Sequence, residues 1–312
     1  MSDQKQVSLW RFWSPRFWPS WAGICLMWMI AKLPYPVQLI LGGLLGRLMY
    51  WLMPKRKRIA RINIGLCFPE LDESERSRLL KENFKSLGIG IIELAMTWWG
   101  PGKRLRRLVQ VEGIEHLQNA LKKGKGALLL SAHFTTLEIG SRLITFYQPI
   151  AAMYRRYKNP LFGEILKRVR NNIFESAVLH SNVRGLVSCL KKNLPVWYAP
   201  DQNYQRRYCV FVPFFNIPTA TITTTSRIAR LSGAEVIPFF QERLPGTKGY
   251  KLRILPALKD FPSGDDIADT TRINKLIEDE VRRLPEQYFW VHQRFKKMPD
   301  SMESRYKVSK NQ

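Results

Sequence analysis

One stretch near the middle of the chain decides the fold: Ala127-Leu128-Leu129-Leu130-Ser131-Ala132-His133-Phe134-Thr135-Thr136-Leu137-Glu138-Ile139-Gly140. It opens with four apolar residues, which suit a buried strand, and continues into a polar turn that contains His133. A helix is expected to start near Thr135, with Thr135 or Thr136 as its N-terminal cap. His133 would then lie at the carboxyl end of a strand, where the active sites of open α/β sheets are found.

Short apolar runs separated by helical intervals recur on both sides of this stretch. The runs expected to form strands are 127–130, 150–153, 195–198, 209–212, 236–239 and 252–255. The intervals expected to form helices are 73–98, 138–147, 161–173, 183–192, 221–231 and 267–284. This alternation predicts an α/β fold whose sheet is mostly parallel or mixed and is flanked by helices. Because no internal repeat or long linker interrupts it, residues 54–312 are predicted to form one catalytic domain.

The first 53 residues differ from the rest and are predicted to be a membrane anchor. Six of the ten tryptophans lie there, and Phe17–Ala31 and Leu33–Gly46 carry no charge. Each stretch is shorter than the roughly 20 residues that a spanning helix needs. Three arrangements therefore remain open: a span from Phe17 to about Tyr35 with Lys32 at the interface, two helices lying shallowly in one leaflet, or an apolar helix pair packed on the domain.

The chain is strongly basic, which favours a polyanionic partner. It has 50 Lys and Arg residues against 25 Asp and Glu residues, a net charge of +25. The cluster 55–58, Lys-Arg-Lys-Arg, directly follows the apolar segment and predicts contact with anionic lipid on the cytoplasmic face. Nucleic-acid binding is disfavoured, because the aromatic residues gather at the N-terminus instead of alternating with the basic stretches. The four cysteines form no C-x-x-C pair, so a zinc ribbon is excluded.

The turn around His133 can support general-base chemistry. Glu138 follows five positions later, and a carboxylate bonded to one imidazole nitrogen leaves the other nitrogen able to take a proton. Gly-x-Ser-x-Gly is absent, so the substrate is expected to supply the attacking hydroxyl. A capping or core histidine is the alternative. Asp201 ends another predicted strand, where it could also serve as a turn or helix cap.

These residues and several further blocks carry a family resemblance. The blocks are 131–138 (SAHFTTLE), 154–155 (YR), 197–201 (WYAPD), 211–215 (FVPFF), 219–221 (TAT) and 285–296 (PEQYFWVHQRFK). Together they resemble the late acyltransferases of lipid A biosynthesis, from the aromatic N-terminus to Arg305-Tyr306, and the lauroyltransferase branch most of all. The resemblance implies a glycerophosphate-acyltransferase-like α/β fold on the cytoplasmic face of the Gram-negative inner membrane. It also implies transfer of a fatty acyl chain, lauroyl by preference, from acyl carrier protein to a hydroxyacyl chain of the phosphorylated, Kdo-bearing lipid A precursor.

The resemblance also assigns roles to four residues. His133 is expected to be the general base and Glu138 its orienting partner, while Arg155 and Asp201 are expected to bind substrate. No metal or prosthetic group is expected, because a thioester donor is already activated. Positions 180–182 and 202–203 depart from the family pattern, which leaves the donor and acceptor preference open. The alternatives are a paralogue that delivers myristoyl or palmitoleoyl, to the same precursor or to one that is already pentaacylated, and a silent membrane scaffold.

Overall fold

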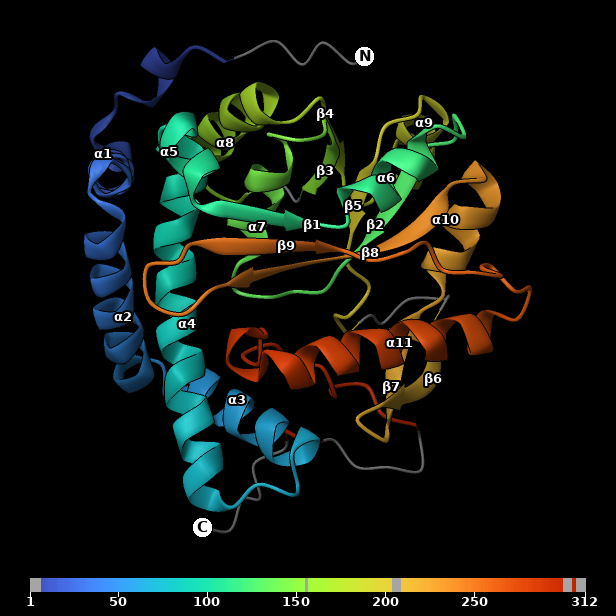
Figure 1. Cartoon of the computed structure of the whole chain (residues 1–312). Helices are drawn as coiled ribbons and strands as arrows, with labels where there is room; N and C mark the ends of the chain where they lie inside the picture. Colours follow the sequence, from blue (N-terminus) through green and yellow to red (C-terminus); the bar gives the residue numbers. More distant parts are fainter. Residues whose placement is uncertain (1–6, 155–156, 204–208, 300–304, 307–312) are drawn as a thin grey trace.

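The computed structural model describes residues 7–154, 157–203, 209–299 and 305–306. At the centre of this part lies a seven-stranded sheet with helices packed around it, and a separate two-stranded hairpin stands beside the sheet (Figure 1). The strand order in the large sheet is β1-β9-β8-β2-β5-β3-β4. Its bounds are β1 Val109–Glu112, β2 Ala127–Leu130, β3 Ala151–Tyr154, β4 Ser176–Leu179, β5 Val196–Tyr198, β8 Glu235–Arg243 and β9 Tyr250–Ile254.

The sheet is parallel apart from one pair. Strand β9 runs antiparallel to β8, whereas every other neighbouring pair is parallel. All four residues of the central strand β2 are fully buried, as expected for a strand covered on both faces. The predicted α/β class, with a mostly parallel or mixed sheet flanked by helices, is confirmed.

Most predicted elements lie within a few residues of the observed ones. The helices after the N-terminal region are α5 Gly102–Arg107, α6 Ile114–Leu121, α7 Leu137–Ile144, α8 Pro160–Ile173, α9 Val183–Lys191, α10 Thr224–Ser232 and α11 Asp266–Arg283. The expected helix 221–231 starts later, at Thr224, because β6 (Cys209–Phe214) pairs antiparallel with β7 (Ile217–Ile222). Strands β1 and β4 were not predicted, since each is a short stretch at an edge of the sheet.

The N-terminal helices pack along a long helix of the domain. They are α1 Trp18–Lys32, α2 Tyr35–Leu52 and α3 Pro54–Cys67, and the long helix is α4 Glu73–Trp99. Figure 1 shows α2 beside α4 over most of its length. Glycines make this approach possible, because a Cβ atom on Gly88 would lie 2.2 Å from the backbone nitrogen of Gly46.

No single helix in the described ranges is long and apolar enough to cross a membrane; α2 and α3 pass that test only together, as a pair bent by 96°. Of the three arrangements left open by the sequence, the span from Phe17 to about Tyr35 is therefore not formed by one helix, since α1 has 15 residues and rises only about 22 Å. Both α1 and α2 nevertheless keep an exposed apolar face. Its most exposed large residues are Trp18, Leu26, Met29, Ile40, Leu44, Leu48, Trp51 and Leu52.

Candidate active site

A histidine and a buried aspartate meet at the carboxyl edge of the sheet. The Nδ1 atom of His133 lies 2.6 Å from Oδ1 of Asp201, and the backbone N–H of His133 donates to Oδ2 at 3.0 Å. Asp201 is only 2% exposed, whereas the His133 side chain is 27% exposed. The aspartate is thus sealed behind the imidazole, and the imidazole can still be reached.

Adjacent strands bring the two residues together. Strands β2 and β5 are parallel and aligned so that Leu130 lies opposite Tyr198. His133 and Asp201 each follow three positions beyond those residues. Because parallel strands end at the same edge, the two side chains are placed as neighbours by the sheet itself.

A segment near the C-terminus completes the carboxylate's surroundings. The hydroxyl of Tyr288 donates to Oδ2 of Asp201 at 3.0 Å. The same segment pairs with the histidine turn, through a bridge between Phe134 and Tyr288 and a hydrogen bond from the Phe289 N–H to the His133 carbonyl at 3.0 Å. Asp201 therefore accepts hydrogen bonds from three groups, which fix its position and that of the ring it holds.

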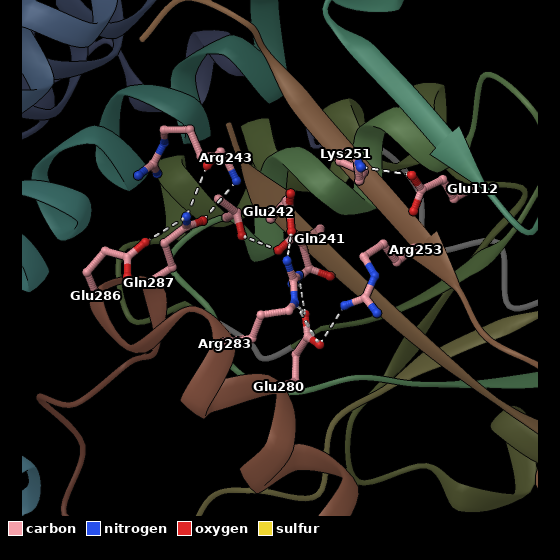
Figure 2. A network of polar contacts seen from close by, with 11 residues as sticks. Glu112, Gln241, Glu242, Arg243, Lys251, Arg253, Glu280, Arg283, Glu286 and Gln287 are labelled. Carbon is pink, nitrogen blue, oxygen red and sulfur yellow. Dashed lines mark hydrogen bonds and ion pairs between the residues drawn. The ribbon is translucent and has the colours of Figure 1, made fainter. Parts of the chain in front are cut away.

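Buried amides tie this segment to the rest of the domain. The side chain of Asn83 on α4 donates to the carbonyls of Glu286 and Tyr288, at 3.0 and 2.7 Å. Figure 2 shows the Gln287 amide against the backbone of Arg243 on β8, where it both donates (3.0 Å) and accepts (2.8 Å). The backbone carbonyl of Gln287 in turn accepts a hydrogen bond from the backbone N–H of Thr135 at 2.7 Å. The histidine turn is thereby anchored to both α4 and β8.

The electrostatics favour an ionised Asp201. Burial alone would raise the pKa of this carboxyl, but the attraction of His133, its hydrogen bonds and the nearby Arg294 together lower the pKa to about 2. Burial and the negative charge of Asp201 raise the pKa of Tyr288 well above its usual value, so Tyr288 remains a hydrogen-bond donor. An anionic Asp201 can stabilise a positive charge on the imidazole when His133 takes a proton.

Glu138 does not have the place that the sequence suggests. Among the described residues, no hydrogen bond joins Glu138 to His133; the Nδ1 atom is taken by Asp201 instead. The backbone of the histidine turn pairs with Tyr288, and α7 starts only at Leu137. The carboxylate bonded to the imidazole is that of Asp201, which follows the neighbouring strand β5. Burial raises the pKa of Glu138, and the charge of Arg170 opposes that rise.

The sequence also singled out Asp201 and Arg155, and it passed over an arginine that acts on Glu138. Asp201, expected to bind substrate, is bonded to His133, and Arg155 lies outside the described residues. Arg170 on α8 was not singled out by the sequence. Its guanidinium carbon lies 4.8 Å from the ring centre of Tyr154 at the end of β3, and its charge acts on Glu138. Because the chain has 50 Lys and Arg residues, the sequence does not distinguish this arginine from the others.

This arrangement defines an α/β enzyme site built for proton transfer. An imidazole held by a buried carboxylate at strand ends can take a proton from a hydroxyl and return it to a leaving group. No group of three or more His, Cys, Asp or Glu residues suited to a metal ion occurs within the described ranges.

Similarity to known proteins identifies the family of this chain. Residues 6–297 match the model of the bacterial lipid A biosynthesis acyltransferases, and the chain belongs to this family. It is 40% identical to the lipid A biosynthesis lauroyltransferase of Escherichia coli K12, over 94% of this chain and 96% of that protein. It is 38% identical to the palmitoleoyltransferase of the same strain (95% and 96%) and 28% identical to its myristoyltransferase (89% and 86%).

Proposed function

We propose that this acyltransferase moves a lauroyl chain from acyl carrier protein to the hydroxyl of a hydroxyacyl chain on the Kdo-bearing, tetraacylated lipid A precursor. The observation that carries the proposal is the His133–Asp201 pair at the carboxyl edge of the sheet. It supplies the general base that a direct transfer from thioester to hydroxyl requires.

The reaction follows from the state of that pair. Because Nδ1 of His133 is hydrogen-bonded to Asp201, Nε2 is the atom that takes the proton of the acceptor hydroxyl. At the same time the hydroxyl oxygen attacks the thioester carbonyl. The tetrahedral intermediate collapses with cleavage of the C–S bond, and the imidazolium returns the proton to the leaving thiolate. Asp201 stabilises the imidazolium between these steps. The product is an ester, no acyl-enzyme forms, and we expect no metal or prosthetic group to be needed.

Similarity to the three transferases ranks the donor chains. Identity to the lauroyltransferase exceeds identity to the palmitoleoyltransferase by only two percentage points, 40% against 38%. The myristoyltransferase, at 28%, is a more distant relative. Lauroyl is therefore the first choice and palmitoleoyl the second.

We also propose that the enzyme lies at the cytoplasmic face of the Gram-negative inner membrane. The exposed apolar faces of α1 and α2 suit insertion into one leaflet. Helix α3 follows directly and begins with the basic cluster 55–58, of which Lys55, Arg56 and Arg58 are exposed. The acidic carrier protein and the phosphorylated lipid would both be attracted by a chain of net charge +25.

A competition assay tests the substrate assignment. The detergent-purified protein is incubated with the tetraacyl precursor and equal amounts of lauroyl-, myristoyl- and palmitoleoyl-carrier protein. The mass of the lipid product is then measured by mass spectrometry. A single added lauroyl chain is expected. A different added chain would overturn the donor assignment, and no added chain from a folded protein would overturn the acceptor assignment. A second run with the pentaacyl precursor would then distinguish a second-step enzyme from a silent scaffold.

A further inference from the structure

A cavity lies between the N-terminal helices and α8, outside the site around His133. Its volume is about 410 Å³, within the range of about 300–1,000 Å³ common for small-molecule pockets. It is bounded by the segment before α1, by α1 itself, by the end of α4, and by α7 and α8. The lining residues that matter here are Trp21, Trp98, Arg142, Ile165, Arg168 and Val169. The wall is mostly aromatic and aliphatic, which suits a hydrocarbon chain.

One of the two arginines in this wall lacks a counterion. Among the described residues, no acceptor lies within hydrogen-bond distance of Arg142, and its Nε atom is fully covered without a partner. The guanidinium carbon lies 5.0 Å from the ring centre of Phe146, which is a weak interaction for a partly buried charge. Burial lowers the pKa of Arg142. A guanidinium withdrawn from water without an anion destabilises the folded protein.

The second arginine is already paired. Nε of Arg168 lies 3.3 Å from Glu164, and its Nη2 donates to the carbonyl of Val7 at 2.7 Å. Within the part of the chain that the structure describes, Arg142 is therefore the arginine of this wall that lacks an anionic partner. The cavity thus combines a long apolar wall with a cation that has no partner among the described residues.

We propose that this cavity binds one acyl chain of an anionic phospholipid, whose phosphate pairs with Arg142. The charge of the headgroup complements the free guanidinium, and the forked donors of arginine suit phosphate oxygens. The location fits a lipid drawn from a leaflet. Helix α1 forms one wall, and the segment leading into it exposes Trp10 and Trp13, at 78% and 64%, while Trp18 at the start of α1 is 60% exposed. Tryptophans of this kind sit at headgroup depth, where lipid phosphates lie.

This site goes beyond the proposed transfer reaction and can be tested without donor or acceptor. The full-length protein in neutral detergent micelles is titrated with phosphatidylglycerol or with phosphatidylcholine, and thermal unfolding and lipid binding are measured. Phosphatidylglycerol is expected to bind more tightly and to raise the melting temperature more. Arg142→Met is expected to weaken phosphatidylglycerol binding about tenfold or more, because a charge-assisted pair is lost. Arg230→Met, at an exposed arginine of α10, is the matched control and should leave binding unchanged.

Stability separates this proposal from a purely structural role of Arg142. Without lipid, Arg142→Met should melt no lower than the wild type, since it removes an uncompensated charge; a lower melting temperature would make Arg142 a structural residue and overturn the site. Val169→Trp, which fills the cavity and keeps Arg142, should also reduce the lipid-induced rise. Equal binding of the two phospholipids, or binding of free lauric acid but not of phosphatidylglycerol, would contradict the assignment.

Discussion

At the scale of single residues, the site depends on which carboxylate holds the histidine. The sequence spacing pointed to Glu138, five positions along the same loop and helix. The fold instead uses Asp201, at the end of the neighbouring strand and 2.6 Å from the imidazole. The pairing of β2 with β5 determines which carboxylate meets His133. The spacing of residues along one stretch of chain carries no information about that pairing.

Replacement of Asp201 tests that choice. In Asp201→Asn the side chain keeps its size but loses the charge that stabilises the imidazolium, so kcat should fall about a hundredfold or more. Asp279→Asn, at an exposed aspartate of α11, is the matched control. Steady-state turnover by both variants, with melting curves, makes the comparison. Wild-type turnover by Asp201→Asn would show that the pair is not catalytic.

Glu138 should influence stability in a pH-dependent manner. Its pKa in the folded protein is raised by burial, so above the usual carboxyl pKa the unfolded chain ionises first and stability falls as pH rises through the raised pKa. Glu138→Gln should therefore raise the melting temperature at pH 8 more than at pH 4. Melting curves at both values, with Glu115→Gln on the exposed face of α6 as control, measure this. A lower melting temperature at pH 8 would show that the ionised carboxylate is stabilising.

At the scale of elements, the strand–helix alternation predicted the central strands and most helices from local pattern alone. The apolar run 127–130 became β2 with the same bounds. The sequence missed contacts between distant segments, such as the bridge of Phe134 to Tyr288. It placed Tyr288 in a family block but offered no sign that its hydroxyl would reach Asp201, because side-chain contacts across 87 positions leave no periodic signal.

The anchoring of the C-terminal segment can be tested at Asn83. Asn83→Ala leaves the buried carbonyl of Tyr288 and the part-buried carbonyl of Glu286 without their donor, which should reduce the free energy of unfolding by about 2 kcal/mol. Turnover should fall as well, because Tyr288 holds Asp201. Denaturant midpoints measure the first effect, and Asn119→Ala on the exposed face of α6 is the control. Unchanged stability would show that water replaces the amide.

At the scale of the whole molecule, net charge and apolar surface are the properties that the sequence predicted most directly, since both are sums over residues. The arrangement of α1 and α2 was less predictable. Composition left spanning, interfacial and packed helices open, and the structure shows the pair packed on α4 with an apolar face exposed. Gly46 on α2 and Gly88 on α4 let these two helices approach closely, so α2 can pack on α4 while its apolar face stays exposed.

The charge of +25 should control encounter with an acidic donor protein. Raising the salt concentration from about 50 to about 500 mM should lower kcat/KM for lauroyl-carrier protein severalfold, because screening shortens the range of attraction. Lauroyl-pantetheine, an uncharged donor, should show a much smaller effect. Equal salt dependence for both donors would contradict electrostatic guidance of the carrier protein.

The most direct test of the central claim is the turnover of His133→Ala beside His116→Ala, with lauroyl-carrier protein and the tetraacyl precursor. Folding of both variants is checked by melting curves. His133→Ala is expected to lose acyl transfer by at least about a hundredfold while keeping its fold, whereas His116→Ala, on α6, is expected to transfer at the wild-type rate. Near-wild-type transfer by a folded His133→Ala would contradict the assignment of the base.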